Sequence, residues 1–276
     1  MKKTAIISTL FTMVFAFCVS GNVMAQNSEI EAVKKPLENY LTNHIKGDSK
    51  QLGKSMHTVG RLIYLRDGKR YYPVEFSKYL SGWKLRDPKI VEQTRSYIDS
   101  IEVTGNVAVA KLGLAYPGRR FTDYMTLLKI NGEWKIVNKI AYSVGDPKNN
   151  SAERGDIDAV KIPLENYLMG HKTGKAEYMK KAFYTEGKLM YMRGGKYSTI
   201  DFKDYIGRMN GKPAKDEAMR KRWIESIDVT GNVAVGKIIL DYPTVKFTDY
   251  MALLKIGNEW KIVNKAFHIE RKQAAK

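Results

Sequence analysis

Two histidines in similar segments are the side chains best suited to acid–base chemistry. His44 and His171 lie on the apolar stripes of two expected helices, over residues 30–44 and 157–171. Both rings are therefore expected to point inward, line internal cavities and avoid solvent. A buried imidazole can be a general base or hold a ligand by a hydrogen bond. A core histidine bonded to a backbone carbonyl is the alternative, because a base also needs a partner and a cavity.

Two asparagines occupy equivalent places in apolar, strand-like segments. Asn138 alternates in phase with Trp134 and Ile136, whereas Lys135 and Lys139 have the opposite phase and are expected to be in solvent. Asn138 should then point inward, and the counterpart Asn264 should do the same. A buried amide needs hydrogen-bond partners, which a ligand, a water or a neighbouring loop would supply.

Aspartates and tyrosines complete the candidate set. Asp123 and Asp249 are acids shared by the strongest repeated strand, and we expect each to pair with a lysine or arginine across the sheet. Four tyrosines could line a pocket and stack on an aromatic ligand, or belong to the core with the hydroxyl at its rim. They are Tyr64, Tyr124, Tyr191 and Tyr250.

Several kinds of catalytic motif do not occur in the sequence. It has no glycine-rich phosphate loop, no nucleophile elbow and no His-x-x-x-His pair. Its 4 histidines have no metal-ligand spacing. We therefore predict neither a metal site nor a cofactor.

The elements that position these residues occur twice. Residues 100–139 and 226–265 are identical at 29 of 40 positions, with a constant offset of 126. The upstream segments 34–44 and 161–171 are offset by 127. The period matches a whole domain and is far longer than a solenoid repeat. The chain is thus a tandem duplication, with either two sites or one site and a degenerate copy.

Each copy reads as helices followed by an antiparallel meander, an α+β layout. In the first copy, apolar periodicity predicts helices over 30–44, 49–56 and 74–83, and alternation predicts a short strand over 61–65. Branched and aromatic residues predict four further strands, over 97–103, 107–116, 120–130 and 134–142. Both faces of these strands are apolar, so both need a cover. Helices can cover one face, and the other copy can cover the second as an internal pseudo-dimer.

The N-terminus has the features of a secretory signal peptide. Lys2 and Lys3 precede an apolar stretch over 5–20, and Val-Met-Ala at 23–25 fits a cleavage site. The only cysteine, Cys18, lies inside it, so the mature chain would contain no disulfide. We expect a signal peptide over 1–25, a first domain over 26–144, a linker over 145–155 and a second domain over 156–276. Export to the periplasm or outside the cell follows.

The charge is strongly positive, with 47 Lys and Arg against 29 Asp and Glu. An anionic surface or an acidic glycan is a possible partner, but scattered charge also serves solubility, which we favour. Nucleic acid is not expected, because no nucleic-acid-binding motif occurs and the signal peptide directs the chain elsewhere.

Three repeated motifs carry a resemblance to a known family. Tyr-Leu-x-x-His-x-x-Gly at 40–47, Asp-Tyr-Met-x-Leu-Leu-Lys-Ile at 123–130 and Trp-Lys-Ile-Val-Asn-Lys at 134–139 all recur in the second copy. They resemble the putative lumazine-binding family, of the nuclear-transport-factor-two-like superfamily. The resemblance covers nearly all of both halves. It implies two tandem cone-shaped domains, each a curved antiparallel sheet wrapped around helices with an internal cavity.

The resemblance leaves the activity open, since the superfamily includes isomerases, dehydratases, cyclases and binding modules. We favour a binding module without catalysis that holds a small apolar or aromatic ligand in one or both cavities. An enzyme that uses His44 with Asp123 is the first alternative, because a pocket carboxylate is a natural base in such enzymes. A scaffold with filled pockets is the second alternative.

Two departures from the family pattern bear on the enzyme alternative. The first copy keeps His57 and Asp48 at family positions, where the second has Tyr184 and Lys175. If these residues served catalysis, the first domain would carry it.

Overall fold

The computed structural model describes residues 6–145 and 156–273, with side chains from residue 26 onward. Most of the predicted linker, the start of the predicted signal peptide and the last residues of the tail therefore lie outside the described residues. None of the described helices combines the length and the apolar character that a membrane span requires.

Each half has helices first and most of its strands afterwards. The first half contains α1 (Ile6–Lys46), α2 (Ser49–Gly53), β1 (Met56–Arg66), β2 (Arg70–Glu75), α3 (Phe76–Ser81), α4 (Pro88–Gln93), β3 (Arg95–Thr104), β4 (Val107–Tyr116), β5 (Arg119–Ile130) and β6 (Glu133–Gly145). The second contains α5 (Ile157–Thr173), α6 (Ala176–Ala182), β7 (Phe183–Arg193), β8 (Lys196–Asp201), α7 (Phe202–Ile206), a short 3-10 helix η1 (Glu217–Met219), β9 (Lys221–Thr230), β10 (Val233–Asp241), β11 (Val245–Ile256) and β12 (Glu259–Arg271).

The two sheets have the same topology. Their strand orders are β2-β1-β6-β5-β4-β3 and β8-β7-β12-β11-β10-β9. The meander from β3 to β6 is antiparallel as predicted, but β1 pairs with β6 in parallel, so the whole sheet is mixed. The helix predicted over 74–83 is too long, because its first residues belong to β2 and pair with β1.

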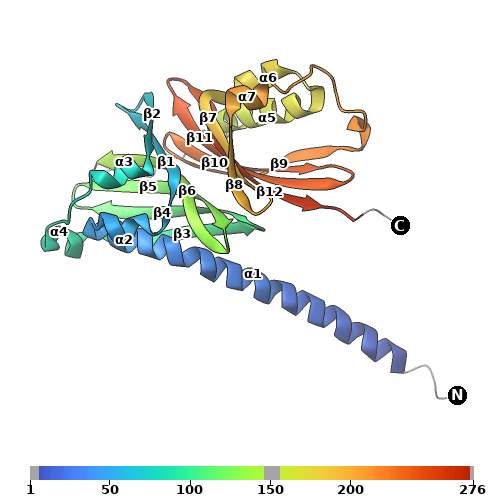
Figure 1. Cartoon of the computed structure of the whole chain (residues 1–276), viewed down its shortest axis with the longest axis horizontal. Helices are drawn as coiled ribbons and strands as arrows, with labels where there is room; N and C mark the ends of the chain where they lie inside the picture. The colour runs from blue at the N-terminus through green and yellow to red at the C-terminus, as the bar shows by residue number, and fades with distance from the viewer. Residues whose placement is uncertain (1–5, 146–155, 274–276) are drawn as a thin grey trace.

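The helices lie inside each cone on the inner face of its sheet, and the outer face is turned toward the other domain (Figure 1). The stripe of α1, including Val33, Leu37 and Tyr40, packs against β4 and β5 in one buried cluster. Gly47 ends α1 with a φ of 75°, and an added Cβ would lie 2.0 Å from the carbonyl oxygen of Lys84. Only glycine tolerates both the left-handed backbone and this close approach. The end of α1 therefore packs directly against the backbone of the loop that follows α3.

A bulge in β6 sets which residues face the cone interior. Register shifts between Thr126 and Leu127, so that Val137 has no separate partner on β5. Beyond the bulge, the alternation is reversed: Asn138 lies on the outer face with Ile140, while Lys139 lies on the inner face. A bulge adds one residue to one strand, which inverts the facing of every later side chain. The equivalent shift occurs in β12.

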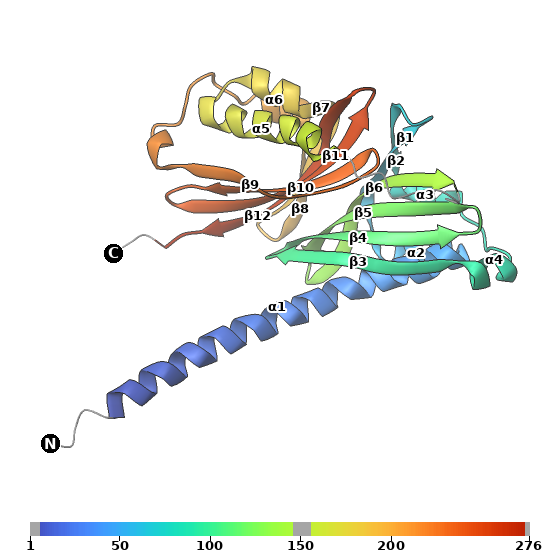
Figure 2. The same cartoon turned by 180° about the vertical axis from the view of Figure 1, so that it is seen from behind.

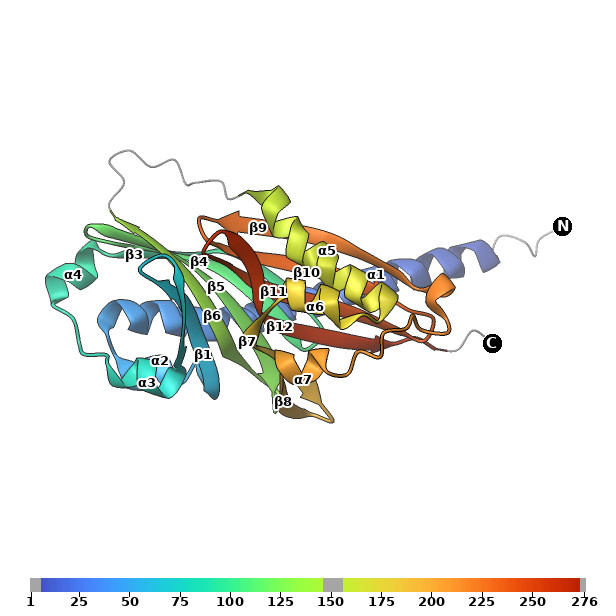
Figure 3. The same cartoon turned by 90° about the horizontal axis from the view of Figure 1, so that it is seen from above.

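The two sheets pack on each other, between the helices of the two domains (Figures 2 and 3). Two buried clusters contain residues of both sheets; one includes Ile63, Ile140 and Val263, and the other includes Leu128 and Tyr250. Around them, Lys111 pairs with Asp228 at 2.8 Å, and the equivalent Lys237 pairs with Glu102. Contacts that recur in exchanged positions define an isologous, two-fold-like interface within one chain.

Candidate functional site

A buried tyrosine, aspartate and lysine lie inside each cone. In the first domain, Asp123 Oδ2 is 2.7 Å from Lys139 Nζ and accepts a hydrogen bond from the Tyr40 hydroxyl at 3.0 Å. Lys139 also donates to the Tyr40 oxygen at 2.6 Å. The second domain repeats the set with Asp249 and Lys265 at 2.8 Å, joined by Tyr167. The predicted pairing of each aspartate with a lysine is thus present.

Lys139 corrects one sequence expectation. It is only 3% exposed, although the uninterrupted alternation of its strand placed it in solvent. Burial opposes its charge, but Asp123 and Tyr79 outweigh burial, and the pKa of Lys139 is raised. Lys139 therefore remains a cation.

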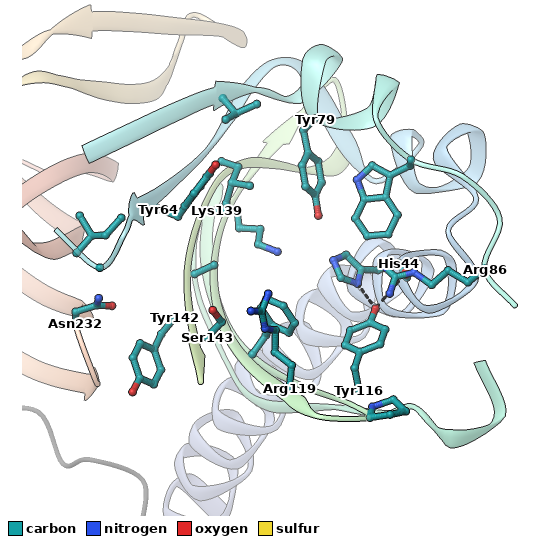
Figure 4. A pocket seen from close by; sticks show the side chains of 18 of the residues that line it. His44, Tyr64, Tyr79, Arg86, Tyr116, Arg119, Lys139, Tyr142, Ser143 and Asn232 are labelled. Atoms are coloured by element: carbon teal, nitrogen blue, oxygen red, sulfur yellow. Dashed lines mark hydrogen bonds between the residues drawn. The ribbon is translucent and has the colours of Figure 1, made fainter. Parts of the chain in front are cut away.

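A cavity of about 800 Å³ opens above Lys139 in the first domain (Figure 4). Aromatic side chains make up much of its wall, and its cations are Lys139, Arg86 and Arg119. The aromatic residues are Tyr64, Tyr79, Trp83, Tyr116, Phe121 and Tyr142. No aspartate or glutamate is among the described residues that line it. The volume falls in the range of about 300–1,000 Å³ that small-molecule sites occupy.

His44 lies in the wall of this cavity and is 6% exposed. Its Nδ1 is 2.6 Å from the Tyr116 hydroxyl, which also donates to the His44 carbonyl at 3.2 Å. Its ring packs edge-on against Trp83 at 4.4 Å between centroids. Burial, followed by the charges of Lys139 and Arg86, lowers the pKa of His44 well below its usual value. His44 is therefore a neutral ring and a weak base.

The equivalent space in the second domain holds side chains. Phe267 stands where the first domain has Ala141, and its ring stacks on Tyr191 at 4.9 Å. Lys265 Nζ lies 4.8 Å from the centre of the Phe267 ring. Tyr191 is buried, whereas its counterpart Tyr64 is only half-buried. A larger side chain at one position thus fills the space above the lysine.

His171 also differs from His44 in its surroundings. Its Nε2 is 3.0 Å from the Tyr205 hydroxyl, and its Nδ1 is 3.3 Å from the Tyr242 hydroxyl. Both ring nitrogens are therefore bonded within the protein. His171 is half-buried as a whole residue, whereas His44 is buried. Burial, then Lys265 and two arginines, lowers its pKa well below the usual value.

Four predicted ligand-binding residues lie away from the cones, at the interface between the sheets. Tyr124 donates to Asp228 at 2.8 Å, and Tyr250 bonds Thr104 at 2.8 Å. Both tyrosines line a smaller, interdomain pocket of about 360 Å³. Asn138 and Asn264 share this sheet face because of the bulge, which corrects the expectation that they point into the cones.

The departures from the family pattern lie outside the cavity as well. The ring of His57 packs on Tyr197 at 4.5 Å, and that of Tyr184 packs on Tyr71 at 4.4 Å, in exchanged positions across the interface. Asp48 caps α2 by accepting from the Gln51 amide at 3.0 Å. These positions therefore do not distinguish a catalytic domain from an impaired one.

Sequence reasoning overlooked residues of the α3–β3 region. Tyr79, Trp83 and Arg86 line the cavity from segments whose pattern gave no functional signal. One signal was available: within the repeat, Ala141 is matched by Phe267. A small residue replaced by a large aromatic one on an inner strand face indicates a cavity in one copy and its filling in the other.

The chain is thus a tandem of two cone-shaped α+β domains, and the first contains a cavity of about 800 Å³. The family described as "Putative lumazine-binding" matches residues 28–142 and 155–268. The chain therefore belongs to this family, in two tandem copies.

Other similar proteins each match about one domain of this chain. A curated relative, the aldolase FrzH from Cladobotryum sp, is 23% identical over 115 residues, which are 41% of this chain and 90% of FrzH. An NTF2-like protein of unknown function from Methylobacillus flagellatus is 30% identical, with a TM-score of 0.37, over 44% of this chain and 96% of that one. A ketosteroid isomerase-like protein from Erwinia carotovora atroseptica is 12% identical, with a TM-score of 0.35, over 44% and 99%.

Proposed function

We propose that this protein is an exported small-molecule-binding protein in which the first domain holds an apolar or aromatic ligand. The second domain is its degenerate copy and serves as a structural partner. The observation behind this proposal is the aromatic cavity above Lys139, set against the side chains that fill the equivalent space above Lys265. Membership of a family described as lumazine-binding agrees with a ligand-binding role.

Catalysis by His44 and Asp123 receives less support from the geometry. Asp123 Oδ2 is engaged by Lys139 and Tyr40, and the same arrangement recurs in the domain whose space is filled. A general base works best with a pKa near the operating pH, whereas burial lowers that of His44. Lys139 is held as a cation, so it is a poor nucleophile. A binding role needs none of these groups to react.

A filled first cavity is the sharpest test. Ala141→Phe places the second domain's ring into the first domain, and Val59→Phe adds the same ring at an exposed position as a control. Native mass spectrometry of the exported wild type and of Val59→Phe should show a co-purifying small molecule, and Ala141→Phe should lack it. A small molecule retained by Ala141→Phe would place the binding site elsewhere.

Export has a separate test. The N-terminal sequence of the mature protein should begin at Gln26, directly after the Val-Met-Ala at 23–25. Full-length protein that begins at Met1 and stays in the cytoplasmic fraction would reject export without affecting the binding proposal.

A further inference from the structure

One cation of the first cavity lacks an anionic partner. The Arg86 guanidinium lies 4.9 Å from the centre of the Trp83 ring and 4.5 Å from that of Tyr116. Figure 4 shows its side chain extending toward His44 and Tyr116. Within the described part of the chain, no carboxylate forms an ion pair with Arg86. Two aromatic rings thus hold a guanidinium in place at the cavity wall, and its hydrogen-bond donors are available to a ligand.

The second domain supplies the missing partner from its own chain. Tyr242, the counterpart of Tyr116, has two guanidinium groups near its ring centre, that of Arg220 at 4.2 Å and that of Arg222 at 5.4 Å. Arg220 pairs with Asp216 at 2.8 Å. Both terminal nitrogens of Arg222 donate to Glu217, at 2.6 and 2.9 Å. This is the two-bond geometry by which arginine recognises a carboxylate. In the second domain, each guanidinium near this tyrosine is therefore paired with a carboxylate. In the first domain, the guanidinium of Arg86 lies over the equivalent tyrosine without a carboxylate partner among the described residues.

The second domain also supplies a ring. Phe267 lies over Lys265 Nζ and against Tyr191, whereas Ala141 leaves the corresponding space over Lys139 and beside Tyr64 unfilled. An aromatic face over an ammonium is an attractive contact. In the second domain, Glu217 thus supplies a carboxylate to a guanidinium near the tyrosine, and Phe267 supplies an aromatic ring over the lysine.

We infer that the ligand of the first cavity is an aromatic carboxylate, with its carboxylate on Arg86 and its ring between Tyr64 and Lys139. This inference rests on the proposed function and specifies its ligand class. The absence of acidic side chains from the described lining and the further cation Arg119 at the rim agree with an anionic ligand. In the first domain, the carboxylate of the ligand would take the place of Glu217, and its ring would take the place of Phe267.

Two small molecules of similar shape, one negatively charged and one neutral, test whether the cavity prefers a carboxylate. Naphthalene-2-carboxylate and its uncharged analogue, naphthalene-2-carboxamide, are titrated calorimetrically into the full mature chain. The wild type should bind the carboxylate on the order of tenfold more tightly, the factor that one charge-assisted hydrogen bond of about 1.4 kcal/mol provides. Arg86→Gln should lose this preference, and Arg86→Lys should retain part of it. Arg120→Gln removes one exposed positive charge outside the cavity lining and should keep the full preference.

The possible failures are distinguishable. Equal affinities for the two probes, both abolished by Ala141→Phe, would overturn the inference and leave the proposed function intact. A preference that survives in Arg86→Gln would also overturn it, provided that circular dichroism shows the variant to be folded. Failure of both probes to bind would overturn the inference and, if no small molecule co-purifies with the wild type, the proposed function as well.

Discussion

The two domains have the same fold and the same buried ion pair, but they differ in the side chains that surround the space above it. Each buries the same tyrosine, aspartate and lysine, with ion-pair distances of 2.7 and 2.8 Å. Above this shared floor, the first domain has a cavity of about 800 Å³, and the second has Phe267 packed on Tyr191. The repeated residues maintain the cone, while the unrepeated position places a small side chain, Ala141, or a large one, Phe267, beside the buried lysine.

The two domains also differ in the arginine that lies near the tyrosine at the equivalent position, Tyr116 or Tyr242. In the second domain, Arg222 lies near the Tyr242 ring and forms an ion pair of 2.6 Å with Glu217. In the first, position 96 is a serine, and the guanidinium over the equivalent tyrosine comes from Arg86 instead. Under the proposed function, side chains of the second domain would make the contacts that a ligand makes in the first.

Separation of the domains should produce the largest effect. Fragments 26–145 and 156–273 would each expose the apolar sheet face that the two domains now bury against each other. We expect each fragment to dimerise or aggregate, because a large uncovered apolar face is not stable in water. Light scattering after size-exclusion chromatography measures this. Two fragments that remain soluble monomers would show that the internal pseudo-dimer is dispensable.

Loss of the buried aspartate should have the next largest effect, and an equal one in both domains. Asp123→Ala leaves Lys139 buried and unpaired, which costs about 3–5 kcal/mol of unfolding free energy. Asp249→Ala should cost as much in the second domain. Urea denaturation measures both. The double variant Asp123→Ala, Lys139→Met removes the stranded charge and should recover most of the loss. A cost in one domain only would mean that the two ion pairs serve different purposes.

Phe267→Ala should open the second cavity. Since Phe267 is only partly buried, we expect a destabilisation of about 2–3 kcal/mol, at or below the low end of the cost for a fully buried phenylalanine. The variant should bind a second molecule of the uncharged naphthalene probe, because Glu217 still satisfies Arg222. Binding stoichiometry by calorimetry should therefore rise from one to two. An unchanged stoichiometry would show that other side chains fill the space.

The smallest effect concerns pH. The pKa of His44 is lowered in the folded state from its usual 6.5, so the unfolded chain binds a proton that the folded chain does not. The stabilisation that His44 contributes to the free energy of unfolding is complete above pH 6.5. It is lost as the pH falls below that value, by up to about 1.4 kcal/mol per pH unit. His44→Gln should flatten the fall in unfolding free energy between pH 7 and 5.5. His171 should contribute with the same sign, because burial also lowers its pKa well below the usual value. An unchanged slope in His44→Gln would mean that His44 is protonated in the fold.

The sequence by itself determined the duplication, the family and the order of elements. Near-identity over residues 100–139 and 226–265 cannot arise by chance, and alternation located the meander strands to within a few residues. Periodicity along α1 also identified its inner face, because the stripe of a regular helix depends on spacing alone. The pairing of Asp123 with a lysine or arginine across the sheet was also predicted, although the particular residue, Lys139, was not.

Only the tertiary structure decided which side chains meet. The bulge at Val137 reversed the facing of Asn138 and Lys139, and a register shift depends on the neighbouring strand rather than on local pattern. The packing of the sheets moved Tyr124 and His57 from the expected site to the interface. Trp83 and Arg86 reach the cavity because their loop lies against the end of α1, where the Arg86 amide donates to the Lys46 carbonyl at 3.0 Å. Cavities and interfaces are formed by residues that are distant in sequence, so local spacing defines the elements and long-range packing defines the site.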